Sequence, residues 1–287
     1  MKPSWLNKNI KLKDCQRMEV LLHGLNLNTV CHKALCPNIG ECFLQGHVTF
    51  LILGNICTRG CKFCSVPKGK PAEIDPDEPK RVAEAAKRLN LKHIVITSVT
   101  RDDLKDQGSG LFAETVLRIR ENLRHSSIEI LIPDFLGDEK AINNVVEVKP
   151  DIIGHNLETV PRLYKEVCNG ASYERSIKVL STIKNMDSNI YTKSGLMLGM
   201  GEQQQELLDV FYDLRKVECD FLSLGQYLSG GPKQYPVKEY LSPQVFDDYK
   251  EKALDYGFSF VVSSPYARSS YLAQEYLRRG PKLFEND

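Results

Sequence analysis

Short β-rich segments alternate with helix-like segments along most of this chain, and this alternation limits the folds that it can adopt. In the intervening segments, apolar residues recur with the spacing of an amphipathic helix, for example in residues 78–89 and 204–217. Strands that alternate with helices in this way form parallel sheets with right-handed crossovers. We predict strands at residues 49–53, 93–97, 128–132, 151–154, 195–198 and 221–224.

The segments that follow these strands are polar, and most of them contain glycine. In an open doubly wound sheet, ligand contacts gather at one switch point, whereas in a barrel the loops after all strands converge on one mouth. We therefore predict an α/β fold with a partial (β/α)6 barrel of the TIM type at residues 48–235. Residues 1–47 and 236–287 lie outside the repeat and are predicted to be N-terminal and C-terminal extensions.

Charge and hydropathy exclude several classes of function. The chain of 287 residues has 38 Lys and Arg against 37 Asp and Glu, so no field of one sign attracts nucleic acid or an anionic membrane. The apolar run at residues 48–53 is too short to span a bilayer, and the first residues lack the features of a signal peptide. We expect a cytoplasmic protein that binds neither nucleic acid nor a membrane.

The chain has nine cysteines, and in a reducing cytosol these indicate metal binding, redox chemistry or core packing rather than disulfides. Six form two triplets. A structural zinc ion takes four ligands and each triplet supplies three, so zinc would require pooling both triplets. Iron–sulfur clusters held by three cysteines fit the spacing better. The triplets are Cys31, Cys36 and Cys42, then Cys57, Cys61 and Cys64, while Cys15, Cys168 and Cys219 are expected to be core or incidental thiols.

The second triplet directly follows the first predicted strand, at the mouth of the predicted barrel. A 4Fe–4S cluster held by three thiolates leaves one iron free to bind an exchangeable molecule. The motif CxxxCxxC, with Phe63 before its last cysteine, resembles the signature of radical S-adenosylmethionine (SAM) enzymes. That resemblance implies that SAM chelates the open iron and is cleaved reductively. The product would be a deoxyadenosyl radical that abstracts hydrogen from an unactivated carbon.

Other segments are similar to cofactor-binding parts of the same superfamily. Residues 195–202 resemble the strand motif that supports the adenine, although a plain glycine-rich strand end is the alternative. The loop at residues 97–98 stands where the methionyl amino group is commonly met. Residues 155–158 are either further SAM contacts or the capped start of a helix. The candidate cofactor contacts are Thr97, Ser98, Asn156, Glu158, Gly199 and Glu202.

The first triplet narrows the resemblance from the superfamily to one family within it. Its pattern CxxxxCxxxxxC, with PNIGEC inside it, closely resembles lipoyl synthases. So do the segments TSVTRDDLKDQG, LIPDFLG, HNLETVPRLY, KSGLMLGMGE, LGQYL and RSSY, which together extend the resemblance over nearly the whole chain. The departures are Leu272, where the family often carries His, and residues 229–236. Both lie outside the expected ligands and bear on carrier preference more than on chemistry.

Membership in that family implies the insertion of two sulfur atoms into the octanoyl chain of a lysine on a lipoyl carrier domain. It implies that Cys57, Cys61 and Cys64 hold the radical SAM cluster. It further implies that an auxiliary 4Fe–4S cluster supplies the sulfur. A hard oxygen ligand matches an iron–sulfide site less well than thiolate, so it can leave as the cluster is dismantled. The implied auxiliary ligands are Cys31, Cys36, Cys42 and Ser270.

The resemblance also implies partners. These are an octanoylated lipoyl domain or glycine-cleavage H protein as substrate, a flavodoxin- or ferredoxin-type reductant, and a carrier that rebuilds the auxiliary cluster. Two other functions remain open at this point. A biotin-synthase-like or methylthio-transferring radical enzyme would share the second triplet but should not need the first triplet with RSSY. A non-catalytic two-cluster electron carrier would instead have two four-cysteine clusters.

Overall fold

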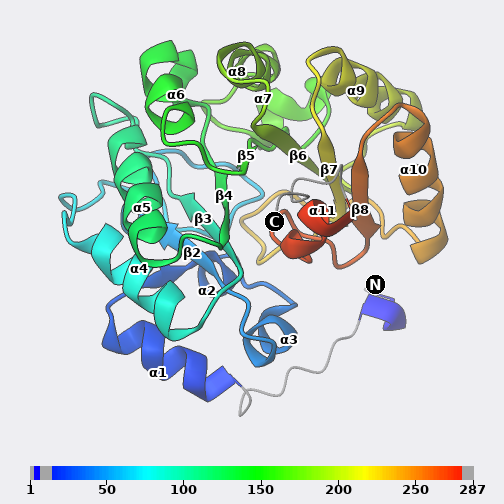
Figure 1. The fold of residues 1–287 in the computed structure, drawn as a ribbon. Coiled ribbons are helices and arrows are strands. Elements are labelled where there is room, and N and C mark those ends of the chain that lie inside the picture. Colours follow the sequence, from blue (N-terminus) through cyan, green and yellow to red (C-terminus); the bar gives the residue numbers. More distant parts are fainter. Residues whose placement is uncertain (1–2, 7–14, 280–287) are drawn as a thin grey trace.

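A computed structural model describes residues 3–6 and 15–279, which form an α/β domain around one curved sheet (Figure 1). The sheet has eight strands in the order of the sequence, and every neighbouring pair is parallel except β1 with β2. The predicted partial barrel is confirmed. The strands are β1 (Asn28–Thr29), β2 (Thr49–Ile52), β3 (His93–Ser98), β4 (Ser127–Leu131), β5 (Ile152–Gly154), β6 (Tyr191–Leu198), β7 (Phe221–Gln226) and β8 (Phe260–Ser264).

Helices surround the outer face of the sheet in Figure 1. Helix α4 is an example of how the sequence produces this layer. Its first turn contains Pro79, which is tolerated at a helix start. Its residues Val82, Ala83 and Ala86 form one buried apolar stripe. No helix in the described part of the chain is long and apolar enough to cross a membrane. The outer helices are α4 (Glu78–Arg88), α5 (Ser109–Asn122), α6 (Glu139–Val146), α7 (Tyr164–Val167), α8 (Tyr173–Met186), α9 (Gln204–Lys216) and α10 (Pro243–Asp255).

The sheet contains one more parallel strand than the six predicted. Strands β2 to β7 match the predictions, but β8 pairs in parallel with β7 and lies within residues 236–287, the predicted C-terminal extension. Helix α10 and β8 therefore add a βα unit of the same kind beyond residue 235. The strand has only five residues, and it escaped the sequence analysis because the alternation was taken to end before it.

The segments that flank the two edge strands contact each other. Helices α2 (Val30–Lys33) and α3 (Ile39–Leu44) follow β1, and α1 (Gln16–Gly24) precedes it. The Asn38 side-chain amide donates a hydrogen bond to the carbonyl of Tyr266 (2.7 Å), and the Tyr271 hydroxyl donates to the carboxylate of Glu41 (3.1 Å). These bonds join segments from opposite ends of the chain.

A short C-terminal helix, α11 (Ala273–Arg279), lies at the centre of the ring of strands in Figure 1. Its Tyr276 is fully buried against Phe221 of β7 and Phe260 of β8. The Lys193 ammonium lies 3.7 Å from the centre of the Tyr276 ring and 2.9 Å from the Glu129 carboxylate. Lys193 and Glu129 side chains are only 2% and 1% exposed, so this ion pair is isolated from water.

We predict that Glu129→Ala is among the most destabilising single changes in the sheet. It leaves the buried Lys193 ammonium without its carboxylate, and breaking a buried pair costs about 3–5 kcal/mol of unfolding free energy. Anaerobic urea unfolding measures this loss. The control is Glu84→Ala, which removes the exposed partner of Arg88 and should cost about 0–1 kcal/mol. Equal losses in the two variants would contradict the prediction.

Candidate active site

The three cysteines of the second triplet lie on the loop that follows β2. Backbone hydrogen bonds anchor this loop: Cys57 N–H donates to Pro67 O (2.8 Å), Thr58 N–H to Thr100 O (3.1 Å) and Lys62 N–H to Val167 O (2.8 Å). Burial, reinforced by the neighbouring thiols, raises the pKa of Cys61 to about 12 and that of Cys64 to about 11. Because clusters bind thiolates, metal binding must displace the protons of these two thiols.

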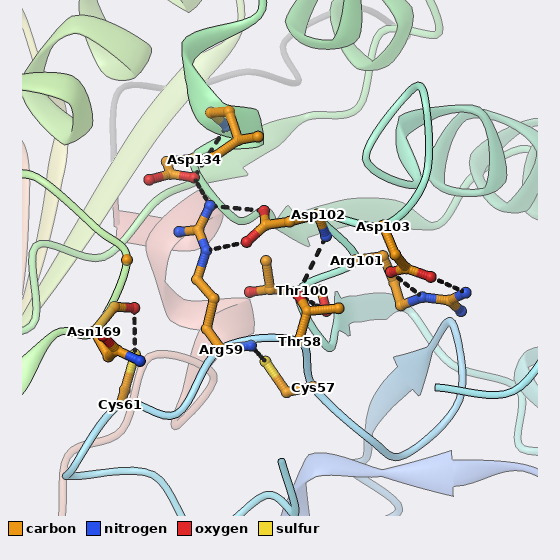
Figure 2. A network of polar contacts seen from close by, with 12 residues as sticks. Cys57, Thr58, Arg59, Cys61, Thr100, Arg101, Asp102, Asp103, Asp134 and Asn169 are labelled. Atoms are coloured by element: carbon orange, nitrogen blue, oxygen red, sulfur yellow. Dashed lines mark hydrogen bonds and ion pairs between the residues drawn. The ribbon is translucent and has the colours of Figure 1, made fainter. Parts of the chain in front are cut away.

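Arg59, between the first two cysteines of this loop, is the centre of a buried ion-pair network (Figure 2). Its guanidinium makes two hydrogen bonds to the Asp102 carboxylate (2.6 and 2.8 Å) and a third to Asp134 (2.7 Å). Asp102 follows β3 and Asp134 follows β4, so the network joins the loops after three consecutive strands. Figure 2 shows the Arg59 side chain directed toward the two carboxylates and away from the thiols.

The same network reaches a fourth loop. Arg175 of α8 binds the second oxygen of Asp134 (2.7 Å) and also donates to the carbonyl of Gly170 (2.5 Å). The preceding residue, Asn169, accepts a hydrogen bond from the Cys61 thiol (3.7 Å). The sequence analysis did not single out Arg59. Its position inside the cysteine motif, together with the acidic residues after the next two strands, was the available signal.

The first triplet lies at a separate cavity. Cys31 of α2, Cys36, Cys42 of α3 and Ser270 all line it, and its empty space is about 630 Å³ including the open mouth. Burial raises the pKa of Cys31 to about 11. The cavity thus brings together the four residues that the sequence analysis grouped from opposite ends of the chain.

The donor sets of both sites suit iron–sulfur clusters. Thiolates are soft ligands, and in such clusters each binds a different iron atom. Within residues 3–6 and 15–279, no three His, Cys, Asp or Glu side chains converge on a position for a single metal ion. At the first cavity the Arg268 guanidinium lies close enough to Cys36 for their charges to interact.

The predicted cofactor contacts after β3 and β6 have different environments. The Ser98 hydroxyl is enclosed and, among the described residues, has no hydrogen-bond partner. The Thr97 hydroxyl donates to the carbonyl of Leu131 (2.9 Å). The Glu202 carboxylate accepts from the N–H groups of Gly199 (2.5 Å) and Met200 (2.9 Å), so it already stabilises its own loop.

Gly199 has a structural reason to be glycine. Its φ is +95°, and a Cβ atom there would lie 2.3 Å from the side chain of Gln226 and from the carbonyl of Glu239. The Gln226 amide donates to the carbonyls of Leu198, Tyr227 and Glu239, and thereby holds the strand end and the loop together. Gln226 was not among the predicted site residues, although it lies in the quoted LGQYL segment.

Of the residues that follow β5, some pack in the core and others lie near the second triplet. His155 bonds the Ile132 carbonyl and the Ser176 hydroxyl (both 2.9 Å) and is buried, so its role is structural. Burial raises the pKa of the enclosed Glu158 carboxyl to about 7. Its charge in turn raises the pKa values of Cys61 and Cys64, which places Glu158 beside the second triplet. Asn156 donates to Glu158 (3.2 Å).

The cysteines outside the triplets are buried, as predicted. Cys15 and Cys219 are fully enclosed. Cys168 is also buried, but it lies close enough to Cys61 and Glu158 for their charges to raise its pKa further. Its position beside the second triplet could not be inferred from the sequence, because it lies far from that motif along the chain.

Comparisons with known proteins show which sequences this chain is similar to. The Radical SAM superfamily model matches residues 51–214. A lipoyl synthase from Caldicellulosiruptor saccharolyticus is 54% identical over 275 residues, which cover 96% of each chain. One from Geotalea uraniireducens is 54% identical over 279 residues, which cover 97% of this chain and 98% of the relative.

Solved structures share the fold at low sequence identity. Methylornithine synthase (PylB) superposes with a TM-score of 0.58 at 16% identity, covering 75% of this chain and 70% of PylB. HydG, a maturase of the [FeFe]-hydrogenase, gives a TM-score of 0.57 at 13% identity, covering 86% of this chain and 62% of HydG. These likenesses concern the fold alone.

We predict that Asp134→Ala destabilises the protein by about 3–5 kcal/mol, because Arg59 and Arg175 lose the buried carboxylate that they share. Chemical unfolding under anaerobic conditions gives the value. Asp138→Ala is the control: its half-buried side chain caps α6, and its loss should cost about 1 kcal/mol. A loss for Asp134→Ala no larger than that of the control would show that the network does not stabilise the fold.

Proposed function

The chain belongs to the lipoyl synthase family of the radical SAM superfamily, and from this premise we propose how its two thiol sites divide the work. Lipoyl synthases insert two sulfur atoms into the octanoyl chain carried by a lysine of a lipoyl carrier protein. One site must therefore activate carbon, and the other must supply sulfur.

The site for carbon activation is the loop after β2, where we assign Cys57, Cys61 and Cys64 as ligands of the radical SAM 4Fe–4S cluster. The assignment is supported by the three thiols lying close enough together for their charges to interact. Three ligands for four irons would leave one iron of the cluster open. SAM bound there supplies a deoxyadenosyl radical that removes hydrogen from an unactivated carbon. Arg59 and its carboxylate partners hold the loop in shape.

The candidate SAM contacts fall into two groups, according to whether their polar atoms already form hydrogen bonds within the protein. Ser98, with its enclosed and unpartnered hydroxyl, is the candidate for a direct hydrogen bond. Glu158 places a carboxylate beside the cysteine loop. Thr97, Gly199 and Glu202 are engaged within the protein, so they shape the cofactor site through their loops. Asn156, also predicted as a SAM contact, uses its amide nitrogen for bonds to Glu158 and Ser269, so it too is assigned to shaping the site.

The sulfur-supplying site is the cavity shared by the two ends of the chain, with Cys31, Cys36, Cys42 and Ser270 as ligands of the auxiliary 4Fe–4S cluster. The observation that carries this proposal is that all four line one cavity although they are distant in sequence. When bound, the cluster supplies the sulfide. The Ser270 oxygen is its weakest-matched ligand and therefore the one that leaves most readily.

The partners follow from the chemistry. The substrate is an octanoylated lipoyl domain or glycine-cleavage H protein, an electron enters from a flavodoxin- or ferredoxin-type reductant, and a carrier protein rebuilds the consumed cluster. Cysteines that hold clusters as thiolates require a reducing compartment, which supports the cytoplasm as the location. Anaerobic incubation with an octanoyl-lysine peptide, SAM and a reductant tests the overall activity by mass analysis for added sulfur.

Cys61→Ala should abolish SAM cleavage and leave the auxiliary cluster in place. The loop would then offer only two thiolates, so the iron content should fall from about eight to about four atoms per chain. Deoxyadenosine release and iron counting measure the two effects. Cys15→Ala, which removes a core thiol, should retain both clusters. Continued deoxyadenosine release by Cys61→Ala would refute the ligand assignment.

Ser270→Ala should still cleave SAM but form little or no lipoyl product, because the auxiliary cluster loses its oxygen ligand. Ser259→Ala, at an exposed position, is the control and should form product normally. Reconstituting the unsubstituted protein with heavy sulfide tests the sulfur source directly. Product without the label would rule out the cluster as donor.

A further inference from the structure

A hydrogen-bonded bridge joins the two thiol sites across the inside of the barrel. The Asn156 side-chain nitrogen donates to the Glu158 carboxylate (3.2 Å) and to the Ser269 hydroxyl (2.7 Å). A primary amide carries two N–H donors, so both are engaged. Asn156 therefore binds both acceptors, Glu158 and Ser269, at the same time.

The two ends of the bridge belong to different sites. Glu158 is near enough to Cys61 and Cys64, on the loop after β2, for its charge to act on both thiols. Ser269 directly precedes Ser270, which lines the cavity of the first triplet. No residue of the bridge is among the cysteines of either site. The bridge is thus a direct polar connection between the surroundings of the two triplets.

The backbone around the bridge is built for this close approach. Glu158 N–H donates to Gly195 O (2.9 Å), Met197 N–H donates to Glu158 O (2.8 Å), and these bonds hold Glu158 at a φ of +67°. A non-glycine residue in that region costs about 1–3 kcal/mol, and such strain clusters at functional sites.

Gly195 supplies the room. A Cβ atom at this position would lie 2.9 Å from the Asn156 side-chain oxygen, 3.2 Å from the Ser269 hydroxyl and 2.6 Å from the Ser223 hydroxyl. Real Cβ atoms essentially never come within 3.0 Å of other heavy atoms, so a side chain here would displace the bridge. Packing against the bridge therefore explains why position 195, the first glycine of the KSGLMLGMGE segment, is glycine.

We propose that Asn156 is a positioning residue that sets the register between the carbon-activating site and the sulfur-supplying site by holding the Ser269–Ser270 turn. This inference rests on the proposed function of the two sites. A carbon activated at one site must meet sulfur at the other within bonding reach, and a misplacement of about 1 Å can cost about a hundredfold in rate. A rigid amide between the sites keeps that distance constant without itself contacting the reacting atoms.

The first test separates radical formation from sulfur insertion. Ser269→Ala removes the bridge bond and retains Ser270. Deoxyadenosine formation should stay within about threefold of the unsubstituted protein, while lipoyl product per deoxyadenosine should fall about tenfold or more. The control is Ser263→Ala on β8, which removes another buried serine hydroxyl, one that donates to the carbonyl of Phe246 on α10 (2.6 Å), and it should preserve that ratio. An unchanged ratio in Ser269→Ala, or a proportional fall of both quantities, would overturn the proposal.

The second test does not depend on turnover. In the full-length chain with Cys57, Cys61 and Cys64 all replaced by Ala, the remaining cluster is the auxiliary one, and its iron release to a chelator can be timed. Asn156→Ala and Ser269→Ala should each speed release about three- to tenfold, the size expected for one buried hydrogen bond. The double variant should be no faster than either single variant, because both remove the same bond.

Additive acceleration in the double variant, or release at the unsubstituted rate in both single variants, would contradict the bridge. The two tests also separate this inference from the proposed function. If the unsubstituted protein forms no lipoyl product, the proposed function fails. The iron-release series still decides whether Asn156 and Ser269 act together on the auxiliary site.

Discussion

The contact between the two ends of the chain is the constraint on which the proposed active site depends. A sheet with strand order β1 to β8 has two edges, and the segments next to those edges carry the first triplet and Ser270. Hydrogen bonds from Asn38 to Tyr266 and from Tyr271 to Glu41 hold these segments together. Closing so long a loop costs conformational entropy, which the burial of Tyr276 and its neighbours in the barrel offsets.

Charges inside the barrel and at its mouth are paired rather than excluded. Lys193 and Glu129 bond each other beneath α11, and Arg59 bonds Asp102 and Asp134 at the mouth. Unpaired charges in such positions would cost several kcal/mol each. The pairs link strands and loops that are not adjacent in sequence, so they specify one arrangement of the mouth. The cysteine loop is held in shape by this arrangement through Arg59.

The chemistry of the family requires the loops at the mouth of the barrel to be held rigidly. Two sites that act in succession on one acyl chain must keep a constant separation, and flexible loops at the end of a barrel would not provide it. The described structure connects the loops after β2, β3, β4 and β5 with ion pairs and hydrogen bonds. It also connects them to the RSSY turn, so that both proposed sites belong to one polar framework.

Several features could be read from the sequence because they depend on local spacing. The strand–helix alternation predicted β2 to β7, and the cysteine spacings predicted which thiols would gather. Strand β8 was missed because the repeat was taken to end before a segment of only five residues. The burial of Cys15, Cys168 and Cys219 followed from their isolation outside any motif.

Other features were decided only by the tertiary structure. Arg59 pairs with carboxylates after two other strands, Cys168 lies beside Cys61, and Asn156 bonds both Glu158 and Ser269. No sequence motif links the residues that meet in these contacts. Local sequence determines which residues can bind a cluster, because ligand spacing is a property of one loop. The relative position of two sites on different loops is set by the packing of the whole sheet, which no single segment encodes.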